Sequence, residues 1–141
     1  MSGPIRIAAA LIDDGGGRLL LVRKRGTAAF MQAGGKIDPG ETAPEALVRE
    51  LGEELGWRPP QSVLRFLGIA TAEAANEPGR EVEAHLFHLR AADRSFSAAA
   101  ELDEVIWAQL DEAEALPLAP LTRNHVLPLA RALAAGGEGS A

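Results

Sequence analysis

The sequence contains no cysteine and no tyrosine, and only two tryptophans and four phenylalanines among its 141 residues. The absence of cysteine excludes disulfide bonds and thiolate metal sites, and nothing in the composition indicates export. No apolar run approaches the ~20 residues that a membrane-spanning helix needs. The N-terminal segment MSGPIRIAAALIDD predicts a strand and a turn, not a signal peptide. We therefore predict a soluble cytoplasmic protein without a membrane partner.

Acidic residues outnumber basic ones, and the formal net charge is −6. Such a charge disfavours broad electrostatic binding to a nucleic acid polymer. The length suits a single domain that is large enough to bury a core. We place that domain at residues 1–135 and expect residues 136–141 to be a disordered tail. The sequence leaves open whether the protein is a monomer or a homodimer.

Hydrophobic patterning predicts mostly strands outside the middle of the chain. The expected strands are Ile5–Ile12, Arg18–Arg25, Leu64–Ala75, Glu81–Arg90 and Val105–Gln109. Two turn signals, at residues 13–17 and 76–79, join the first four into pairs. A C-terminal helix is expected over Leu121–Ala135, with Thr122 as its N-cap and Pro128 either bending it or marking its first turn. This order of elements predicts an α+β fold.

A helix over Ala43–Leu55 is predicted by local signals at both of its ends. Thr42 and Glu45 have the spacing of a capping box, in which each side chain bonds the other residue's backbone N–H. Gly56 is the expected stop, and apolar residues recur between the two ends at helical spacing. The segment therefore forms a helix with one buried face.

Three carboxylates, those of Glu50, Glu53 and Glu54, would lie on one face of this helix beside its apolar stripe. Like charges at these spacings destabilise a helix, and a hard divalent cation such as Mg²⁺ would relieve the repulsion. Arg49 could hold one carboxylate in place. Gly52, which is unfavourable in a helix interior, could allow close packing of the backbone. The three carboxylates alone also fit an ordinary solvated acidic face. The residues around them are needed to choose between a metal site and such a face.

That wider pattern runs from Gly35 to Trp57, as GKIDPGETAPEALVRELGEELGW. Its fixed letters are Gly35, Glu41, Arg49-Glu50-Leu51, Glu53-Glu54 and Gly56-Trp57. They stand at the spacing of the Nudix box, so the chain resembles the Nudix (MutT-like) hydrolases. The resemblance implies an α/β/α sandwich around a mixed β-sheet. It also implies a metal site formed by Glu50, Glu53, Glu54 and the backbone carbonyl of Gly34.

The resemblance also implies contacts with the substrate outside the box. Arg23, at the end of the second expected strand, and Lys36, after Gly34-Gly35, would bind phosphate. Glu104, or Glu101 near it, would be a downstream acid that binds a further metal or acts as a base. Arg23, Glu101 and Glu104 each also fit a solvated surface position.

Ala33 stands where the family commonly has a proline before the two glycines. Trp107 is expected in the core, and the three histidines (His85, His88 and His125) in structural or exposed positions.

The implied reaction is Mg²⁺-dependent hydrolysis of a nucleoside diphosphate linked to another group X, with Mn²⁺ as an alternative metal. The general base stays open among the box glutamates and a downstream acid. The lack of tyrosine disfavours diadenosine-polyphosphate hydrolysis, and the lack of cysteine excludes isopentenyl diphosphate isomerase. A proline about sixteen residues beyond the box, common in ADP-ribose hydrolases, is also missing. We favour a (deoxy)nucleoside triphosphate as substrate, giving nucleoside monophosphate and pyrophosphate. The alternatives are an ADP-ribose or nucleotide-sugar pyrophosphatase, and a non-catalytic domain that senses a nucleotide metabolite.

Overall fold

The computed structural model describes residues 3–75, 77–91 and 95–136. Its strands are β1 (Ile5–Asp13), β2 (Arg18–Lys24), β3 (Phe30–Met31), β4 (Ala33–Lys36), β5 (Arg65–Glu73), β6 (Glu81–Arg90) and β7 (Leu102–Gln109). Its helices are α1 (Ala43–Leu55), α2 (Leu110–Glu114) and α3 (Leu127–Gly136), with a 3₁₀ turn η1 (Gln61–Val63) and a π-helical turn η2 (Thr122–Val126). In the described part of the chain, no helix is long and apolar enough to cross a membrane.

The seven strands form one mixed sheet with the order β3-β2-β1-β6-β5, to which β4 adds beside β1 and β7 beside β2. Strands β1 and β6 pair in parallel along the whole length of β1, and the other pairs are antiparallel. On its other side β1 pairs with β4 over Ile7–Ala10 but with β2 only at Asp13. Strands β1 and β2 therefore diverge, and β4 lies in the opening between them.

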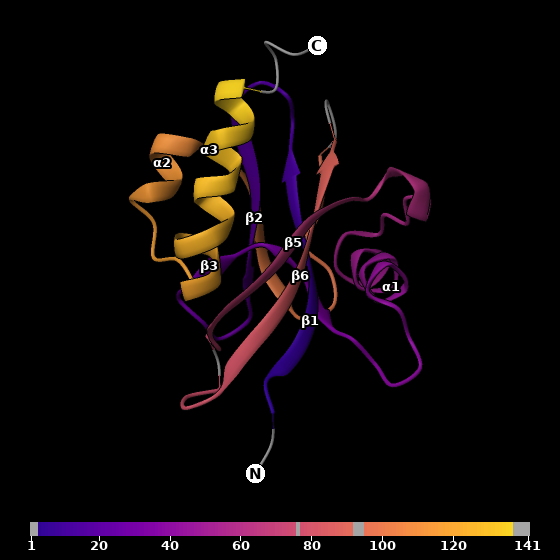
Figure 1. Cartoon of the computed structure of the whole chain (residues 1–141). Helices are drawn as coiled ribbons and strands as arrows, with labels where there is room; N and C mark the ends of the chain where they lie inside the picture. The colour runs from indigo at the N-terminus through magenta and orange to yellow at the C-terminus, as the bar shows by residue number, and fades with distance from the viewer. Residues whose placement is uncertain (1–2, 76, 92–94, 137–141) are drawn as a thin grey trace.

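Helices cover both faces of the sheet, with α1 on one side and α2 and α3 on the other (Figure 1). Strand β1 is buried on both faces: Ala8, Ala10 and Ile12 pack in the core under α1, and Ala9 and Leu11 pack in the core under α2 and α3. The small side chains of Ala8, Ala9 and Ala10 leave room for the helices to pack close to the middle of this strand. The predicted α/β/α sandwich around a mixed sheet is confirmed.

Helix α1 has the predicted bounds and the predicted capping box. The backbone N–H of Glu45 donates to the Thr42 hydroxyl, and the N–H of Thr42 donates to the Glu45 carboxylate. Gly56 ends the helix with a φ of 68°, a left-handed conformation that favours glycine. Strand β6 also has its predicted bounds, whereas β1, β2, β5 and β7 differ from prediction by one to three residues at their ends.

The C-terminal helix differs from prediction at its start. The helical turn begins at Pro120, and the following η2 turn holds a bond from the Leu127 N–H to the Thr122 carbonyl. Thr122 is therefore inside the helical segment and is fully buried, so the prediction of an N-cap was wrong. Pro128 is the second residue of α3 and directly follows the π-helical turn, so it lies inside the continuous helical segment and does not mark its start. Gly136 is the last residue of α3, and the rest of the expected tail, residues 137–141, lies outside the described residues, as does Asn76 of the second expected turn.

Candidate active site

The three box glutamates project from α1 toward β4 with different exposure. Glu54 is almost fully buried, and the N–H of Gly34 donates to its carboxylate at 3.2 Å. The Glu50 side chain is mostly buried, and that of Glu53 is half exposed. A pocket of about 250 Å³ opens above them. Its lining is Lys24, Gly34, Gly35, Lys36, Glu50, Glu53, Glu54, Ala100 and Glu101.

Burial makes this cluster electrostatically unfavourable without a cation. Desolvation raises the pKa of Glu54 to about 7, and the Gly34 hydrogen bond and Lys24 offset only part of that effect. Desolvation also raises the pKa of Glu50, despite its contact with Arg49. Carboxylates held in this state bind a divalent cation readily, because the cation supplies the missing compensation.

Arg49 connects the box loop to the helix. Its guanidinium donates to both carboxylate oxygens of Glu41, at 2.7 and 2.9 Å, and to Glu50 at 2.9 Å. It also donates to the backbone carbonyl of Lys36 at 3.0 Å. The Glu41 contact lowers the pKa of that carboxyl to about 2 and raises the pKa of Arg49. Arg49 therefore fixes the position of Glu50. This is the contact expected from the sequence, in which Arg49 holds one carboxylate of the helix.

Gly34 and Gly35 bring the β4 backbone closer to its neighbours than a side chain would allow. A Cβ on Gly34 would collide with the backbone carbonyl oxygen of Ala8, and the φ of Gly34 is 138°. A Cβ on Gly35 would collide with the Glu50 carboxylate. Gly52, expected to admit close backbone packing, is instead covered by the Arg58 side chain, whose Cζ would lie 2.6 Å from an added Cβ.

Alanine substitutions at the two glycines of β4 should therefore differ in their effects. In Gly34→Ala the new methyl group meets rigid backbone at a left-handed φ, so we expect the free energy of unfolding to fall by roughly 3 kcal/mol or more. In Gly35→Ala it meets the end of a flexible side chain, so we expect a loss of less than about 1 kcal/mol but at least a roughly tenfold lower kcat. Urea unfolding and steady-state hydrolysis measure the two effects. Equal destabilisation in both variants would contradict this assignment.

The donor set of the pocket suits a hard divalent cation. The carboxylates of Glu50, Glu53 and Glu54 line the pocket and offer only oxygen, the ligand atom that Mg²⁺ prefers. Among the described residues, no group of three or more aspartate, glutamate, histidine or cysteine side chains is arranged so that it could hold a metal ion by itself. A divalent cation in this pocket would therefore need further ligands, such as water and substrate phosphate.

Of the basic residues near the end of β2, Lys24 faces the pocket. The guanidinium of Arg23 instead donates to Glu104 at 2.8 Å and to the carbonyl of Thr27 at 2.8 Å, and neither Arg23 nor Glu104 lines the pocket. Lys36 lines the pocket and forms an ion pair with Glu77 at 3.3 Å. The structure thus brings Lys36 and the box glutamates together and pairs Arg23 with Glu104. Because side chains alternate between the two faces of a strand, the sequence places Lys24 on the opposite face from Arg23 and Arg25. It does not indicate which of the two faces meets α1.

A second pocket, of about 140 Å³, adjoins the first. The two share Lys24, Gly34, Gly35 and Lys36 as lining residues. The remaining wall of the second is mostly apolar, with Ile5, Ile7, Met31, Val82, Ala119 and Leu121, and carries the polar residues Gln32, Glu73 and Glu77. An apolar slot with a few polar groups is the usual form of a small-molecule site.

Gln32 is the buried polar residue of this second pocket, and no pattern in the sequence indicates its role. Its side-chain oxygen accepts a hydrogen bond from the Thr122 hydroxyl at 2.8 Å, and both residues are buried. Among the described residues, the amide nitrogen of Gln32 has no hydrogen-bond partner. Every fully buried polar side-chain atom in that part of the chain does have a partner, so this nitrogen is not fully buried. The amide nitrogen is therefore accessible from the pocket as a donor.

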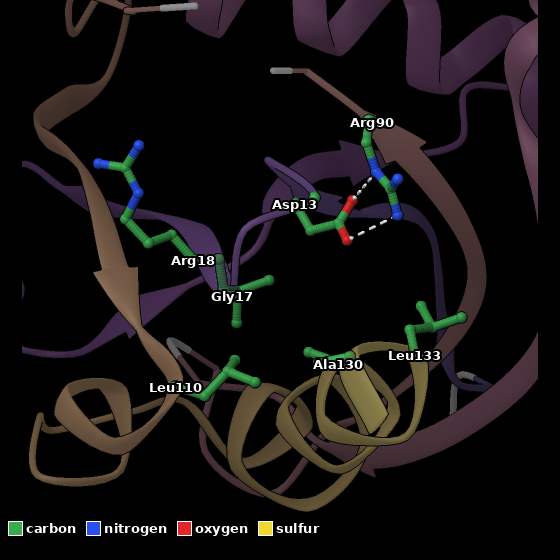
Figure 2. Close-up of a pocket in the computed structure, with 10 residues that line it drawn as sticks. Asp13, Gly17, Arg18, Arg90, Leu110, Ala130 and Leu133 are labelled. Carbon is green, nitrogen blue, oxygen red and sulfur yellow. Dashed lines mark hydrogen bonds and ion pairs between the residues drawn. The ribbon is translucent and has the colours of Figure 1, made fainter. Parts of the chain in front are cut away.

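A third pocket, of about 30 Å³, lies at the opposite end of β1 and holds no box residue (Figure 2). Asp13 and Arg90 are joined there by hydrogen bonds of 3.2 and 3.3 Å, and Leu110, Ala130 and Leu133 form the facing wall. His88 also bonds Asp13, at 2.8 Å, and these contacts lower the pKa of Asp13 against the effect of its burial. The carboxylate is already paired and the volume suits about one water, so this pocket is not the reaction site.

The mixed sheet, the box helix and its open carboxylate cluster define a Nudix hydrolase. The model of the NUDIX domain matches residues 3–130, and the chain belongs to this family. It is thus a hydrolase of a family that acts on nucleoside diphosphates linked to another group and generally uses divalent metal ions.

Individual relatives are similar over most of the chain. CTP pyrophosphohydrolase of Escherichia coli is 34% identical over 121 residues, which are 82% of this chain and 84% of that protein. An 8-oxo-dGTP diphosphatase of Haemophilus influenzae is 41% identical over 95 residues, 55% of this chain and 70% of that protein. The solution structure of the E. coli ORF135 protein matches with a TM-score of 0.72 at 30% identity, covering 93% of this chain and 91% of that one.

Proposed function

We propose that this protein hydrolyses a (deoxy)nucleoside triphosphate to a nucleoside monophosphate and pyrophosphate, with Mg²⁺ or Mn²⁺ as cofactor. The observation that carries the proposal is the shared wall of the two pockets. A nucleoside in the apolar pocket would extend its phosphates past Lys24 and Lys36 to the carboxylates of α1. The names of the two relatives, a CTP pyrophosphohydrolase and an 8-oxo-dGTP diphosphatase, support a triphosphate over a nucleotide sugar.

In this proposal Glu50, Glu53, Glu54 and the Gly34 carbonyl hold the metal. The bound metal would neutralise phosphate charge and lower the pKa of the attacking water. Water attacks one phosphorus of the α–β anhydride, the bond from that phosphorus to the bridging oxygen breaks, and that oxygen leaves with the other phosphoryl group. The water proton passes to a carboxylate of the box or to Glu101.

The protein's own cations would stabilise the charge that develops on the phosphates. Lys24 and Lys36 line the passage between the pockets. Arg49 would act as a positioning residue, because it binds Glu50 and does not itself line the pocket. Arg23 and Glu104 stay predictions, and their mutual ion pair would have to open before Arg23 reached a phosphate or Glu104 bound a further metal or acted as a base.

The test is hydrolysis with Mg²⁺ of canonical and oxidised nucleoside triphosphates, ADP-ribose, dinucleoside polyphosphates and nucleotide sugars. Pyrophosphate and monophosphate released in equal amounts from a triphosphate, and lost in Glu53→Gln, would support the proposal. Binding of a nucleotide without any turnover would favour a domain that senses nucleotides. Turnover of ADP-ribose alone would identify the protein as an ADP-ribose pyrophosphatase and contradict the proposed triphosphate substrate.

Gln32 and Thr122 should set the choice of nucleobase. The hydrogen bond from Thr122 holds the amide oxygen toward Thr122, so Gln32 turns its amide N–H group to the base and should select one with an acceptor at that edge. We expect Gln32→Met to lower kcat/KM for the preferred nucleotide by roughly 10- to 100-fold, the loss of one buried hydrogen bond. Thr122→Val should leave the preferred substrate usable but reduce discrimination between bases, because the amide can then flip.

The measurement is kcat/KM for the four canonical triphosphates with each variant. Thr71→Val, an exposed threonine on β5 away from both pockets, is the matched control and should leave the ranking unchanged. An unchanged ranking in Gln32→Met would show that the base is selected elsewhere.

A further inference from the structure

Strand β5 is the last strand on its side of the sheet, and β6 is the strand it pairs with. Edge strands of soluble proteins usually carry a charge or a proline that prevents pairing with another chain. Between Arg65 and Glu73, β5 has neither: the seven residues are Phe-Leu-Gly-Ile-Ala-Thr-Ala. The protection that remains is one irregularity of register between Phe66 and Gly68, where Leu67 is the extra residue.

The exposed apolar side chains of the protein gather along this strand. Among the described residues, the large hydrophobic side chains that are exposed are Val63, Phe66 and Ile69, at 51%, 56% and 56%. Val63 ends the η1 turn just before the strand, and the other two lie on the strand itself. Exposed apolar groups that cluster mark an interaction surface more often than scattered ones do.

Phe66 and Ile69 lie on the same face of the sheet as α1. Phe66 pairs with Phe87, whose side chain belongs to the core under α1, and the two rings are 5.4 Å apart. Ile69 pairs with His85, two residues from Phe87 on β6 and therefore on the same face. The free edge and the apolar stripe thus coincide.

The charges at the two ends of β5 indicate what covers it. Arg65 begins the strand, Glu73 ends it, and neither forms an ion pair with any described residue. A strand that added to this edge in the antiparallel sense would need an apolar centre, an acidic end beside Arg65 and a basic end beside Glu73. Strand β5 of a second copy meets all three conditions.

We propose that β5 is a homodimer interface in which the two copies pair antiparallel across a two-fold axis at Ile69. Counted through the extra residue Leu67, this register places Ile69 opposite its own counterpart and Phe66 opposite Thr71 of the second copy. Each Arg65 then lies next to Ala72 of the second copy, beside the acidic end of that strand. The apolar stripes of the two copies form one patch, and one sheet continues through both molecules.

A charge at the centre of the interface tests the proposal. Sedimentation equilibrium of the full chain should show a molecular mass that doubles with concentration, and Ile69→Lys should weaken the dimer by at least roughly tenfold. Ala132→Lys, which adds the same charge at an exposed position of α3, is the control and should dimerise like the wild type. Ile69 lines neither of the two substrate pockets, so nucleotide hydrolysis by Ile69→Lys confirms that the variant is folded.

The lack of cysteine allows a direct test of the register. Ile69→Cys introduces a single thiol, which under mild oxidation should give a covalent dimer if Ile69 faces its counterpart. Ala132→Cys should stay uncrosslinked. A wild type that is monomeric at every concentration, a dimer that Ile69→Lys leaves intact, or a dimer that Ile69→Cys does not crosslink would each overturn the proposal.

Discussion

Replacing Glu54 by glutamine should lower kcat by roughly 10²–10³-fold while the protein stays folded. Glutamine has the same shape and can still accept the hydrogen bond from the Gly34 N–H, so the β4–α1 contact is retained. What is lost is a negative charge in a pocket whose burial strengthens every electrostatic interaction. Steady-state hydrolysis over a range of Mg²⁺ concentrations measures the change.

The matched control is Glu81→Gln, which removes the same charge from an exposed position on β6. It should leave kcat and the Mg²⁺ dependence unchanged. If Glu54→Gln also kept the wild-type kcat at saturating Mg²⁺, the metal site would have to be placed elsewhere on the helix.

The same glutamate should make the metal-free protein less stable as the pH rises from about 4.5 to about 7. Burial raises its pKa from 4.5 to about 7 in the folded chain, so the folded protein keeps a proton that the unfolded chain releases. Its contribution is fully present below the unfolded pKa and is lost as the pH rises through the folded one. The difference in pKa corresponds to about 3 kcal/mol in the free energy of unfolding.

Urea unfolding in EDTA at pH 5 and pH 8 measures this effect, with Glu54→Gln as the reference that lacks the titrating group. Mg²⁺ at pH 8 should restore much of the wild-type stability, because it binds the ionised carboxylates. The carboxyl of Glu41, whose pKa is lowered to about 2, loses its contribution only at lower pH and does not interfere in this window. Equal pH slopes for wild type and Glu54→Gln would contradict the prediction.

The parts of the fold that the sequence predicts well are those with local causes. Helix α1 has a capping box at one end and a glycine stop at the other, and both of its bounds follow from them. Strands β3 and β4 have only two and four residues and exist because β2 and β1 offer them hydrogen-bond partners. Nothing in residues 30–36 reveals those partners, so local patterning predicts no strand there. The start of β7 was missed because its acidic residues are typical of a loop.

The site divides in the same way. The box glutamates and the Arg49–carboxylate contact follow from their spacing on a helix, whereas Lys24 depends on which face of β2 meets α1. Gln32 and Thr122 are 90 residues apart and unremarkable by themselves. Their contact depends on the end of β3 meeting the π-helical turn before α3, a tertiary contact with no sequence signal.

The short strand β4 also bears on which bond the enzyme would cut. All four of its residues pair with Ile7–Ala10 of β1, and its backbone runs so close to Ala8 that a Cβ on Gly34 would collide with the Ala8 carbonyl oxygen. In the proposed binding mode this strand separates the nucleoside from the reacting phosphate and acts as a spacer of fixed length. The distance from the base along the phosphate chain would then determine which phosphorus reaches the carboxylates. The quality of the leaving group would not determine it. Nucleotides with different bases should give the same products, whereas a longer spacer would redirect cleavage along the phosphate chain.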